Sequence, residues 1–166
     1  MLCKTNLRND IIKKNIKILV MDVDGTLTDG KIYMSANGEL CKAFDIKDGC
    51  GIHDILIPAG ILPVIITGRN SEIVQKRCQE LGITEVYQGI SNKLEKLLEV
   101  TQELGAIAYI GDDINDITCM SAIKESGGLV GCPGDAAEQV KEMADFVSEK
   151  SGGNGAVRDF IEWILR

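Results

Sequence analysis

Six short strand-like runs, separated by helical stretches, constrain the fold of this chain more than any other feature. They cover residues 16–23, 61–67, 84–88 and 107–111, with shorter candidates at 128–131 and 145–147. The first, second and fourth runs are almost continuously apolar, as expected for strands that are buried on both faces. Buried strands that alternate with helices are typical of a parallel sheet covered on both sides. The sequence therefore predicts an α/β fold, a Rossmann-like three-layer sandwich with a parallel central sheet.

Glycines mark the ends of two predicted helices. The helix predicted over 71–81 is followed by Gly82, and the helix predicted over 92–104 is followed by Gly105. A glycine directly after the last helical residue commonly adopts the left-handed conformation. We therefore expect both glycines to have a positive φ.

One segment, residues 31–44, interrupts the alternation of strands and helices. It reads as two short strands around a turn at Asn37–Gly38, a dipeptide that favours tight hairpins. We predict a β-hairpin after the first strand, within about residues 29–46. Two strands are too few to be stable alone, so we expect the hairpin to pair with copies of itself.

The spacing of the polar strand ends leaves no room for a cap domain. With 166 residues the chain is expected to form a single domain, 1–166, which ends in a glycine-rich tail and a helix over 151–166. Between Asp24 and Thr67 lie 42 residues, and between Thr67 and Lys93 lie 25, enough only for the hairpin and elements of the sandwich. A small substrate would then bind in an open site, and oligomerisation is a natural way to close it.

The composition excludes some classes of partner. The chain has 18 Lys and Arg against 25 Asp and Glu, a net charge of −7 and only 4% aromatic residues, so it offers no basic, stacking surface for nucleic acid. No apolar run reaches the ~18 residues of a membrane span, and the polar start of the sequence does not resemble a signal peptide. The six cysteines form no C-x-x-C pair and are expected to be free thiols in a reducing cytoplasm.

Polar side chains stand at the ends of three strands and at the start of one helix. They are Asp22, Asp24, Thr67, Lys93, Asp112, Asp113 and Asp116. Because the carboxyl ends of parallel strands meet at one edge of a sheet, a single crevice could collect them all. Two carboxylates about 4 Å apart repel by roughly 4 kcal/mol at an effective dielectric of about 20, so five of them require a cation. With oxygen ligands and only one histidine in the chain, that cation is predicted to be Mg²⁺.

The motifs D-x-D-G-T, T-G-R and G-D-D-x-x-D, in this order and with the lysine between them, resemble the haloacid dehalogenase-like phosphotransferase superfamily over nearly the whole chain. The resemblance implies that Asp22 attacks phosphorus, and that Asp24 acts first as general acid and then as general base. It also implies that Thr67 and Lys93 bind the transferring phosphoryl oxygens.

The same resemblance supplies a ligand set for the metal. Asp22, the main-chain carbonyl of Asp24, and Asp112 resemble the Mg²⁺ ligands of that superfamily. Asp113 and Asp116 would then support these ligands and the lysine from outside.

Longer stretches narrow the resemblance to one family. The segments D-G-x-I-Y-M, N-G-E-L-x-K-A-F, Y-Q-G-I-S-N-K-L and G-G-N-G-A-V-R are similar to those of capless phosphatases that act on 3-deoxy-D-manno-octulosonate 8-phosphate and of their sialic-acid-pathway relatives. This implies a Mg²⁺-dependent phosphomonoester hydrolase that acts through an aspartyl-phosphate on a small phosphorylated sugar acid, in lipopolysaccharide biosynthesis. It also implies a homotetramer in which hairpins pair and a neighbour's glycine-rich tail helps to cover the site.

The resemblance further implies a set of sugar contacts. They are Asp24, Asp45, Ile46, Lys47, Asp48, Gly49, His53, Arg69, Arg77, Lys93 and Asn115. His53 stands where the octulosonate enzymes usually carry an arginine, and Asn154 stands where the tail often carries a basic residue. Arg69 favours the eight-carbon acid, since relatives that act on nine-carbon acids can carry a glutamate there.

Three other functions remain open on the sequence alone. The substrate could be a nine-carbon 2-keto sugar acid 9-phosphate. The chain could be a non-catalytic partner domain of a cytidylyltransferase, although every catalytic position is present. A phospho-accepting receiver domain is the third alternative, but its acceptor aspartate would come from a later strand than its paired acids, whereas D-x-D opens the fold here.

Overall fold

The sheet at the centre of the molecule has six strands, all parallel. In the computed structural model, which describes residues 15–166, they are β1 (Ile18–Met21), β4 (Leu62–Ile66), β5 (Glu85–Tyr87), β6 (Ile107–Ile110), β7 (Leu129–Cys132) and β8 (Phe146–Val147). Their order is β5-β4-β1-β6-β7-β8, and every neighbouring pair is parallel. Each strand lies where the sequence predicts one, and the predicted α/β fold with a parallel sheet is confirmed.

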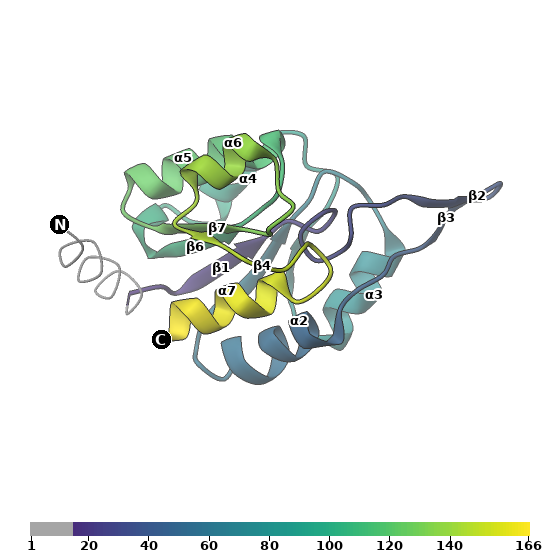
Figure 1. Ribbon diagram of the computed structural model, residues 1–166, viewed down its shortest axis with the longest axis horizontal. Coiled ribbons are helices and arrows are strands. Elements are labelled where there is room, and N and C mark those ends of the chain that lie inside the picture. Colours follow the sequence, from purple (N-terminus) through teal and green to yellow (C-terminus); the bar gives the residue numbers. More distant parts are fainter. Residues whose placement is uncertain (1–14) are drawn as a thin grey trace.

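Helices cover both faces of the sheet and give three layers (Figure 1). One face carries α4 (Lys93–Val100), α5 (Ile117–Glu125) and α6 (Glu138–Met143). The other carries α2 (Ile46–Cys50) with the π-helix η1 (Gly51–Leu56), α3 (Glu72–Glu80) and α7 (Ala156–Leu165). Two 3₁₀ turns, η2 (Leu104–Ala106) and η3 (Ile114–Asp116), flank β6. Residues 15–166 contain no cap domain, as predicted.

Side chains of the central strand alternate between the two layers, because successive residues of a strand face opposite sides. In β1, Leu19 and Met21 pack among residues of α3 and α7, whereas Val20 packs among residues of α4 and α5. Phe160 of α7 and Tyr109 of β6 are fully buried in the two layers. Since both faces of the sheet are covered, its strand ends are where polar side chains can gather.

The hairpin consists of β2 (Tyr33–Ser35) and β3 (Gly38–Cys41), and it projects away from the sheet (Figure 1). Its loop is Ala36–Asn37, one residue earlier than predicted, because Ser35 pairs with Gly38. Gly38 has φ +113°, and within residues 15–166 only glycines have a positive φ. The left-handed position therefore falls on Gly38 rather than on the asparagine, as in a type I turn closed by a glycine bulge.

The prediction from glycines is confirmed at one helix end and wrong at the other. α3 begins after its N-cap Ser71 and is followed closely by Gly82, which has φ +74°. α4 ends at Val100, and Gly105 lies within η2 without a positive φ. Thr101 is extended, and its hydroxyl accepts a hydrogen bond from the backbone N–H two residues later. Such a local bond offers the backbone an alternative to continuing the helix.

The glycine-rich tail packs on the loop that follows β1 of its own chain. The N–H of Gly153 donates to the carbonyl of Thr26 at 3.0 Å, and the N–H of Gly152 donates to Oδ1 of Asp135 at 2.8 Å. A Cβ added to Gly152 would lie 1.8 Å from the carbonyl oxygen of Gly25. In the structure these glycines hold the chain's own loop in place, and the implied contact of the tail with a neighbour's site stays a prediction.

The cysteines that the structure describes are free thiols, as the sequence predicts. Cys41, Cys50, Cys78, Cys119 and Cys132 are free thiols, the last three of them buried, and Cys3 lies outside the described residues. No helix between residues 15 and 166 is long and apolar enough to cross a bilayer.

Gly152→Ala should lower the stability of the protein. The new methyl group would overlap the Gly25 carbonyl, and forced overpacking of this kind costs about 1–3 kcal/mol. Gly68→Ala is the matched control, because a Cβ there meets only the Ile90 carbonyl at an ordinary 3.7 Å. Urea unfolding of both variants measures the difference, and equal stabilities would contradict the tight contact between tail and loop.

Candidate active site

The chain turns sharply after β1 and brings two acidic residues to the edge of the sheet. Asp22 still bonds to β6 through its N–H, which donates to the Ile110 carbonyl at 3.1 Å. The Val23 carbonyl then accepts from the N–H groups of the residues at 26, 27 and 28, at 2.9 to 3.2 Å. Gly25 has φ +97°, and a Cβ there would lie 2.0 Å from Oδ2 of Asp112. Both the backbone conformation and the neighbouring carboxylate therefore require glycine.

A buried lysine joins two of the predicted site carboxylates. Lys93 is the first residue of α4, whose start is capped by Asn92. Its Nζ lies 2.7 Å from Oδ1 of Asp22 and 2.7 Å from Oδ1 of Asp116. The three side chains are at most 6% exposed, so water screens these ion pairs little. Burial alone would lower the pKa of Lys93, but the charges of the two carboxylates outweigh it and raise that pKa.

Both oxygens of Asp116 are occupied by donors from the protein. Oδ1 also accepts from the Tyr109 hydroxyl at 2.6 Å, and Oδ2 accepts from the N–H groups of Asp112 and Asp113 at 3.1 and 3.3 Å. The Asp113 side chain in turn caps η3, forming a reciprocal capping box with Asp116. Asp116 therefore serves to hold Lys93 and the loop after β6, and has little capacity left for a ligand.

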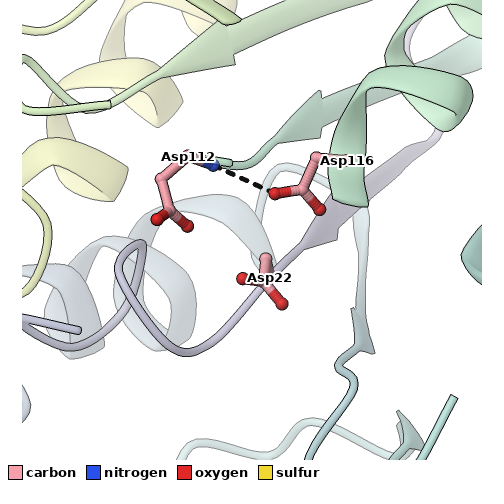
Figure 2. Close-up of side chains that lie close together, drawn as sticks. All are labelled: Asp22, Asp112 and Asp116. Atoms are coloured by element: carbon pink, nitrogen blue, oxygen red, sulfur yellow. Dashed lines mark hydrogen bonds between the residues drawn. The ribbon is translucent and has the colours of Figure 1, made fainter. Parts of the chain in front are cut away.

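The carboxylates of Asp22, Asp112 and Asp116 face one another where β1 and β6 end (Figure 2). One oxygen of each lies within 4.8 Å of the others. Three carboxylates against the single Lys93 ammonium leave an excess of negative charge. Burial and then the charge of Asp116 raise the pKa of Asp22 to about 6, and burial and then the charge of Asp22 raise the pKa of Asp112 to about 7.

This donor set fits a hard divalent cation. Asp22 and Asp112 offer carboxylate oxygens, and the cluster contains no sulfur or imidazole, which is the chemistry that Mg²⁺ prefers. Oδ1 of Asp112 accepts from the Thr26 hydroxyl at 2.9 Å, which orients this carboxylate toward the cluster. A bound cation would neutralise the excess charge that raises the carboxyl pKa values. Asp24, the source of the predicted carbonyl ligand, lies on the same turn as Asp22.

Thr67 lies beside this cluster in sheet order, at the end of β4. Its N–H donates to the Tyr87 carbonyl and its own carbonyl accepts from the N–H of Ile90, both at 3.0 Å. The residue is buried, so its position is fixed by the sheet. Asn115, by contrast, is exposed on η3.

The predicted sugar contacts on α2 have separate structural roles. Asp45 caps the helix, accepting from the N–H of Lys47 at 2.6 Å. Asp48 is buried, and its carboxylate accepts from the N–H groups of Gly155 and Arg158 at 3.2 and 2.8 Å, at the start of α7. Burial raises the pKa of Asp48 to about 6 against the opposing effect of these hydrogen bonds. The Asp48 side chain thus docks α7 onto α2 and does not point into the cluster.

Two other predicted contacts also lie outside the cluster of aspartates. The guanidinium of Arg77 packs where a Cβ on Gly49 would stand, and its Nη1 lies 2.8 Å from Oε2 of Glu80. Its buried Nε has no hydrogen-bond partner among the described residues. His53 is exposed, and its Nδ1 lies 2.6 Å from Oδ1 of the adjacent Asp54.

Sequence reasoning missed four residues that touch the site. Thr26 donates a hydrogen bond to Asp112, and Tyr109 donates one to Asp116. In the hairpin region Lys42 pairs with Asp24, and Glu39 pairs with Lys42. Thr26 belongs to the D-G-T motif and could have been noticed there. Glu39 and Lys42 lie in the N-G-E-L-x-K-A-F stretch that resembles the family, but the stretch does not indicate a contact with Asp24, and Tyr109 cannot be distinguished in sequence from the core of β6.

Asp112→Asn should stabilise the metal-free protein. The amide oxygen can still accept from Thr26, while the repulsion from Asp22 and Asp116 is removed. We expect the unfolding free energy in chelator to rise by about 1 kcal/mol, the scale commonly gained when a strained functional site is relaxed. Excess Mg²⁺ should reverse the order, because a ligand stabilises only the state that binds it.

Urea unfolding in EDTA and in Mg²⁺ measures both effects. Asp113→Asn is the control, since Asp113 is exposed and outside the three-carboxylate cluster. An Asp112→Asn variant that is less stable than the wild type in EDTA would contradict the electrostatic account.

No protein-family model matches the chain, but curated relatives match almost all of it. The protein is 41% identical over 169 residues to the 3-deoxy-D-manno-octulosonate 8-phosphate phosphatase KdsC of Escherichia coli strain K12, covering 98% of this chain and 87% of the relative. The protein of the same name from Salmonella typhi is 42% identical over 156 residues, covering 92% and 80% of the two chains.

Solved structures agree in fold and in sequence. The 3-deoxy-D-manno-octulosonate 8-phosphate phosphatase of Moraxella catarrhalis, in complex with magnesium ion, phosphate ion and KDO, matches with a TM-score of 0.87 and 40% identity over 96% of this chain and 91% of that one. A cobalt-bound phosphatase from Haemophilus influenzae matches with a TM-score of 0.86 and 35% identity over 93% and 90% of the chains. The chain therefore belongs to the 3-deoxy-D-manno-octulosonate 8-phosphate phosphatase family, within the haloacid dehalogenase-like superfamily that its motifs resemble.

Proposed function

We propose that this protein is a Mg²⁺-dependent phosphatase that hydrolyses 3-deoxy-D-manno-octulosonate 8-phosphate. The observation that carries the proposal is the buried Asp22 carboxylate, held 2.7 Å from the Lys93 ammonium and beside Asp112. A fixed carboxylate next to a cation site and a buried ammonium suits covalent phosphoryl transfer. The relative from Moraxella catarrhalis supports the substrate and the metal, since its structure contains a magnesium ion, a phosphate ion and KDO.

The proposed reaction has two steps that share one proton carrier. In the first, an Oδ atom of Asp22 bonds to phosphorus, the ester P–O bond breaks, and Asp24 gives a proton to the leaving ester oxygen. In the second, a water oxygen bonds to phosphorus, the bond between Asp22 and phosphorus breaks, and Asp24 takes a proton from the water. Phosphate leaves, and both carboxyl groups return to their starting states.

Buried positive charge would stabilise the transferring phosphoryl group. We assign Lys93 and Thr67 as its protein contacts, because the lysine is fixed by Asp116 at the required edge of the sheet and the threonine ends the adjacent β4. Mg²⁺, held by Asp22, Asp112 and the Asp24 carbonyl, would supply Lewis-acid charge beside the same oxygens.

Arg69 is the proposed contact for the sugar acid. Its side chain is 42% exposed, and it lies near Asp24, with Nε 3.9 Å from Oδ2. A guanidinium in this position can bind a carboxylate through two hydrogen bonds. Asp45, Ile46, Lys47, Gly49, Arg77 and Asn115 remain proposed contacts, whereas the carboxylate of Asp48 and the side chain of His53 are turned to other partners.

A substrate panel tests the function. We expect the eight-carbon 8-phosphate to give the highest kcat/KM, ahead of a nine-carbon 2-keto acid 9-phosphate and of glucose 6-phosphate. Activity should vanish in excess chelator and return with Mg²⁺. Asp22→Asn should lose at least about a thousand-fold in kcat, because an amide cannot form the acyl-phosphate.

The same panel separates the alternatives. A preference for the nine-carbon acid would move the assignment to that substrate. No turnover of any phosphate by the folded protein would contradict catalysis and favour a non-catalytic partner domain. Near-wild-type turnover by Asp22→Asn would contradict the covalent mechanism.

We further propose a cytoplasmic, single-domain enzyme of lipopolysaccharide biosynthesis that assembles as a homotetramer. The hairpin supports this assembly, because Ile32 just before β2, Met34 in β2 and Leu40 in β3 are 58 to 63% exposed. Among residues 15–166 no third strand pairs with this two-stranded sheet.

Light scattering tests the assembly. The wild type should have about four times the 18.0 kDa mass of one chain. Met34→Glu should shift the mass toward that of the monomer, because it places a charge in the apolar surface of the hairpin. Leu98→Glu, at a similarly apolar but distant exposed position on α4, is the control. A wild type that is monomeric and fully active would contradict the proposal.

A further inference from the structure

Two charged residues of the hairpin region lie against the Asp24 side chain. Nζ of Lys42 pairs with Oδ1 of Asp24 and lies 3.2 Å from Oε1 of Glu39. Only 3% of the Lys42 side chain is exposed. An ammonium taken out of water in this way must be paired, and here the two carboxylates provide the pairing. Lys42 is therefore clamped between the hairpin and the turn after β1.

Glu39 is itself anchored to a third element. Its Oε2 accepts from the hydroxyl of Ser71, the N-cap of α3, and its Oε1 lies 3.7 Å from Nη2 of Arg69. Burial would raise the pKa of Glu39, but the hydrogen bonds from Ser71 and Lys42 outweigh it and lower that pKa. Glu39 is thus an ionised anchor that connects Lys42 to the start of α3.

The two oxygens of Asp24 differ in their surroundings. Oδ1 is engaged by Lys42, whereas Oδ2 lies 3.9 Å from Nε of Arg69, too far for a hydrogen bond. The Asp24 side chain keeps 23% of its surface exposed. One oxygen is therefore anchored by a buried ammonium, whereas the other accepts no hydrogen bond from the described residues and lies near the Arg69 guanidinium.

We propose that Lys42, held by Glu39, is a positioning residue that fixes the Asp24 carboxyl so that Oδ2 carries out the proton transfers. The inference rests on the proposed function, in which Asp24 protonates the ester oxygen and later takes a proton from water. Lys42 is too buried to touch a substrate, so its effect must pass through Asp24. The hairpin then contributes to proton transfer in its own subunit, apart from any role in assembly.

The dependence of the rate on the leaving group tests this role. Phenyl phosphate and p-nitrophenyl phosphate have nearly the same size, but the phenoxide of the first is more basic and needs a proton more. With the Mg²⁺-loaded, full-length enzyme we expect Lys42→Met to lower kcat/KM for phenyl phosphate about ten-fold or more, and for p-nitrophenyl phosphate by less than about three-fold, within the range of acid–base catalysis. Lys31→Met, an exposed lysine at the start of the same hairpin, should leave both values unchanged.

A double-mutant cycle with Asp24→Asn separates positioning from a structural role. Since Lys42 acts through Asp24, Lys42→Met should cost almost nothing further in the Asp24→Asn background. Glu39→Gln can still accept the hydrogen bond from Ser71, so we expect a smaller loss of kcat/KM that again falls mainly on phenyl phosphate. This variant replaces Lys42→Met in the test if Lys42→Met does not fold. Equal losses on both substrates, or an undiminished Lys42→Met effect in Asp24→Asn, would overturn the inference.

Failure of the proposed function is a separate outcome. If the wild type hydrolyses neither aryl phosphate nor any sugar phosphate, the phosphatase assignment itself is wrong. If the wild type is active and depends on Asp22, only the ratio of the two kcat/KM values decides the role of Lys42.

Discussion

The buried ammonium of Lys93 is the interaction on which the site depends. It joins Asp22 on the turn after β1 to Asp116 on the loop after β6, and it comes from the first turn of α4. The two carboxylates compensate for its burial, since an unpaired buried charge costs several kcal/mol. Asp116 in turn is fixed by Tyr109 and two backbone N–H groups. The nucleophile proposed here therefore owes its position to one connected network rather than to its own loop.

Glycine makes the close approach of these loops possible. A Cβ on Gly25 would strike the Asp112 carboxylate, one on Gly111 would lie 2.4 Å from the Asp116 carboxyl carbon, and one on Gly152 would strike the Gly25 carbonyl. At each of the three glycines, a neighbouring backbone carbonyl or carboxylate thus occupies the space that a Cβ would need. The packing of tail on loop, and of loop on carboxylate, explains how a site without a cap domain can still be rigid.

The sequence predicts the sheet well, because buried strands carry their signal in their own residues. All six strands, the hairpin and the convergence of Asp22, Asp112, Asp116 and Lys93 follow from apolar runs and from polar residues at strand ends. The structure differs from the sequence patterns where individual side-chain contacts decide, whether these are local or distant along the chain. α4 stops early at a local bond of Thr101, and the Asp48 carboxylate is directed to α7, more than one hundred residues further along the chain.

For the same reason, the sequence does not predict the second ionic cluster of the site, the one around Asp24. Glu39 and Lys42 are three residues apart on a hairpin, a spacing that by itself indicates nothing about Asp24. The sequence places Ser71 at the start of a helix. In the structure its hydroxyl caps α3 and also donates a hydrogen bond to Glu39 of the hairpin. A pattern along the chain can place a residue on an element, but it cannot show which other element that residue meets.

The cluster around Asp22 and the cluster around Asp24 differ in their balance of charge, and this difference indicates different roles for the two aspartates. In the ionised state in which Asp24 takes a proton from water, Asp24 and Glu39 face the cations Lys42 and Arg69, so the cluster is balanced without a metal. Around Asp22, three carboxylates face one ammonium, so only this cluster demands a divalent cation. A metal ion stabilises a carboxylate only a little where cations of the protein already neutralise its charge. It stabilises carboxylates strongly where their negative charge exceeds the positive charge around them. This difference supports a metal held by the side chain of Asp22 and by only the main chain of Asp24, which keeps the Asp24 carboxyl free to exchange protons.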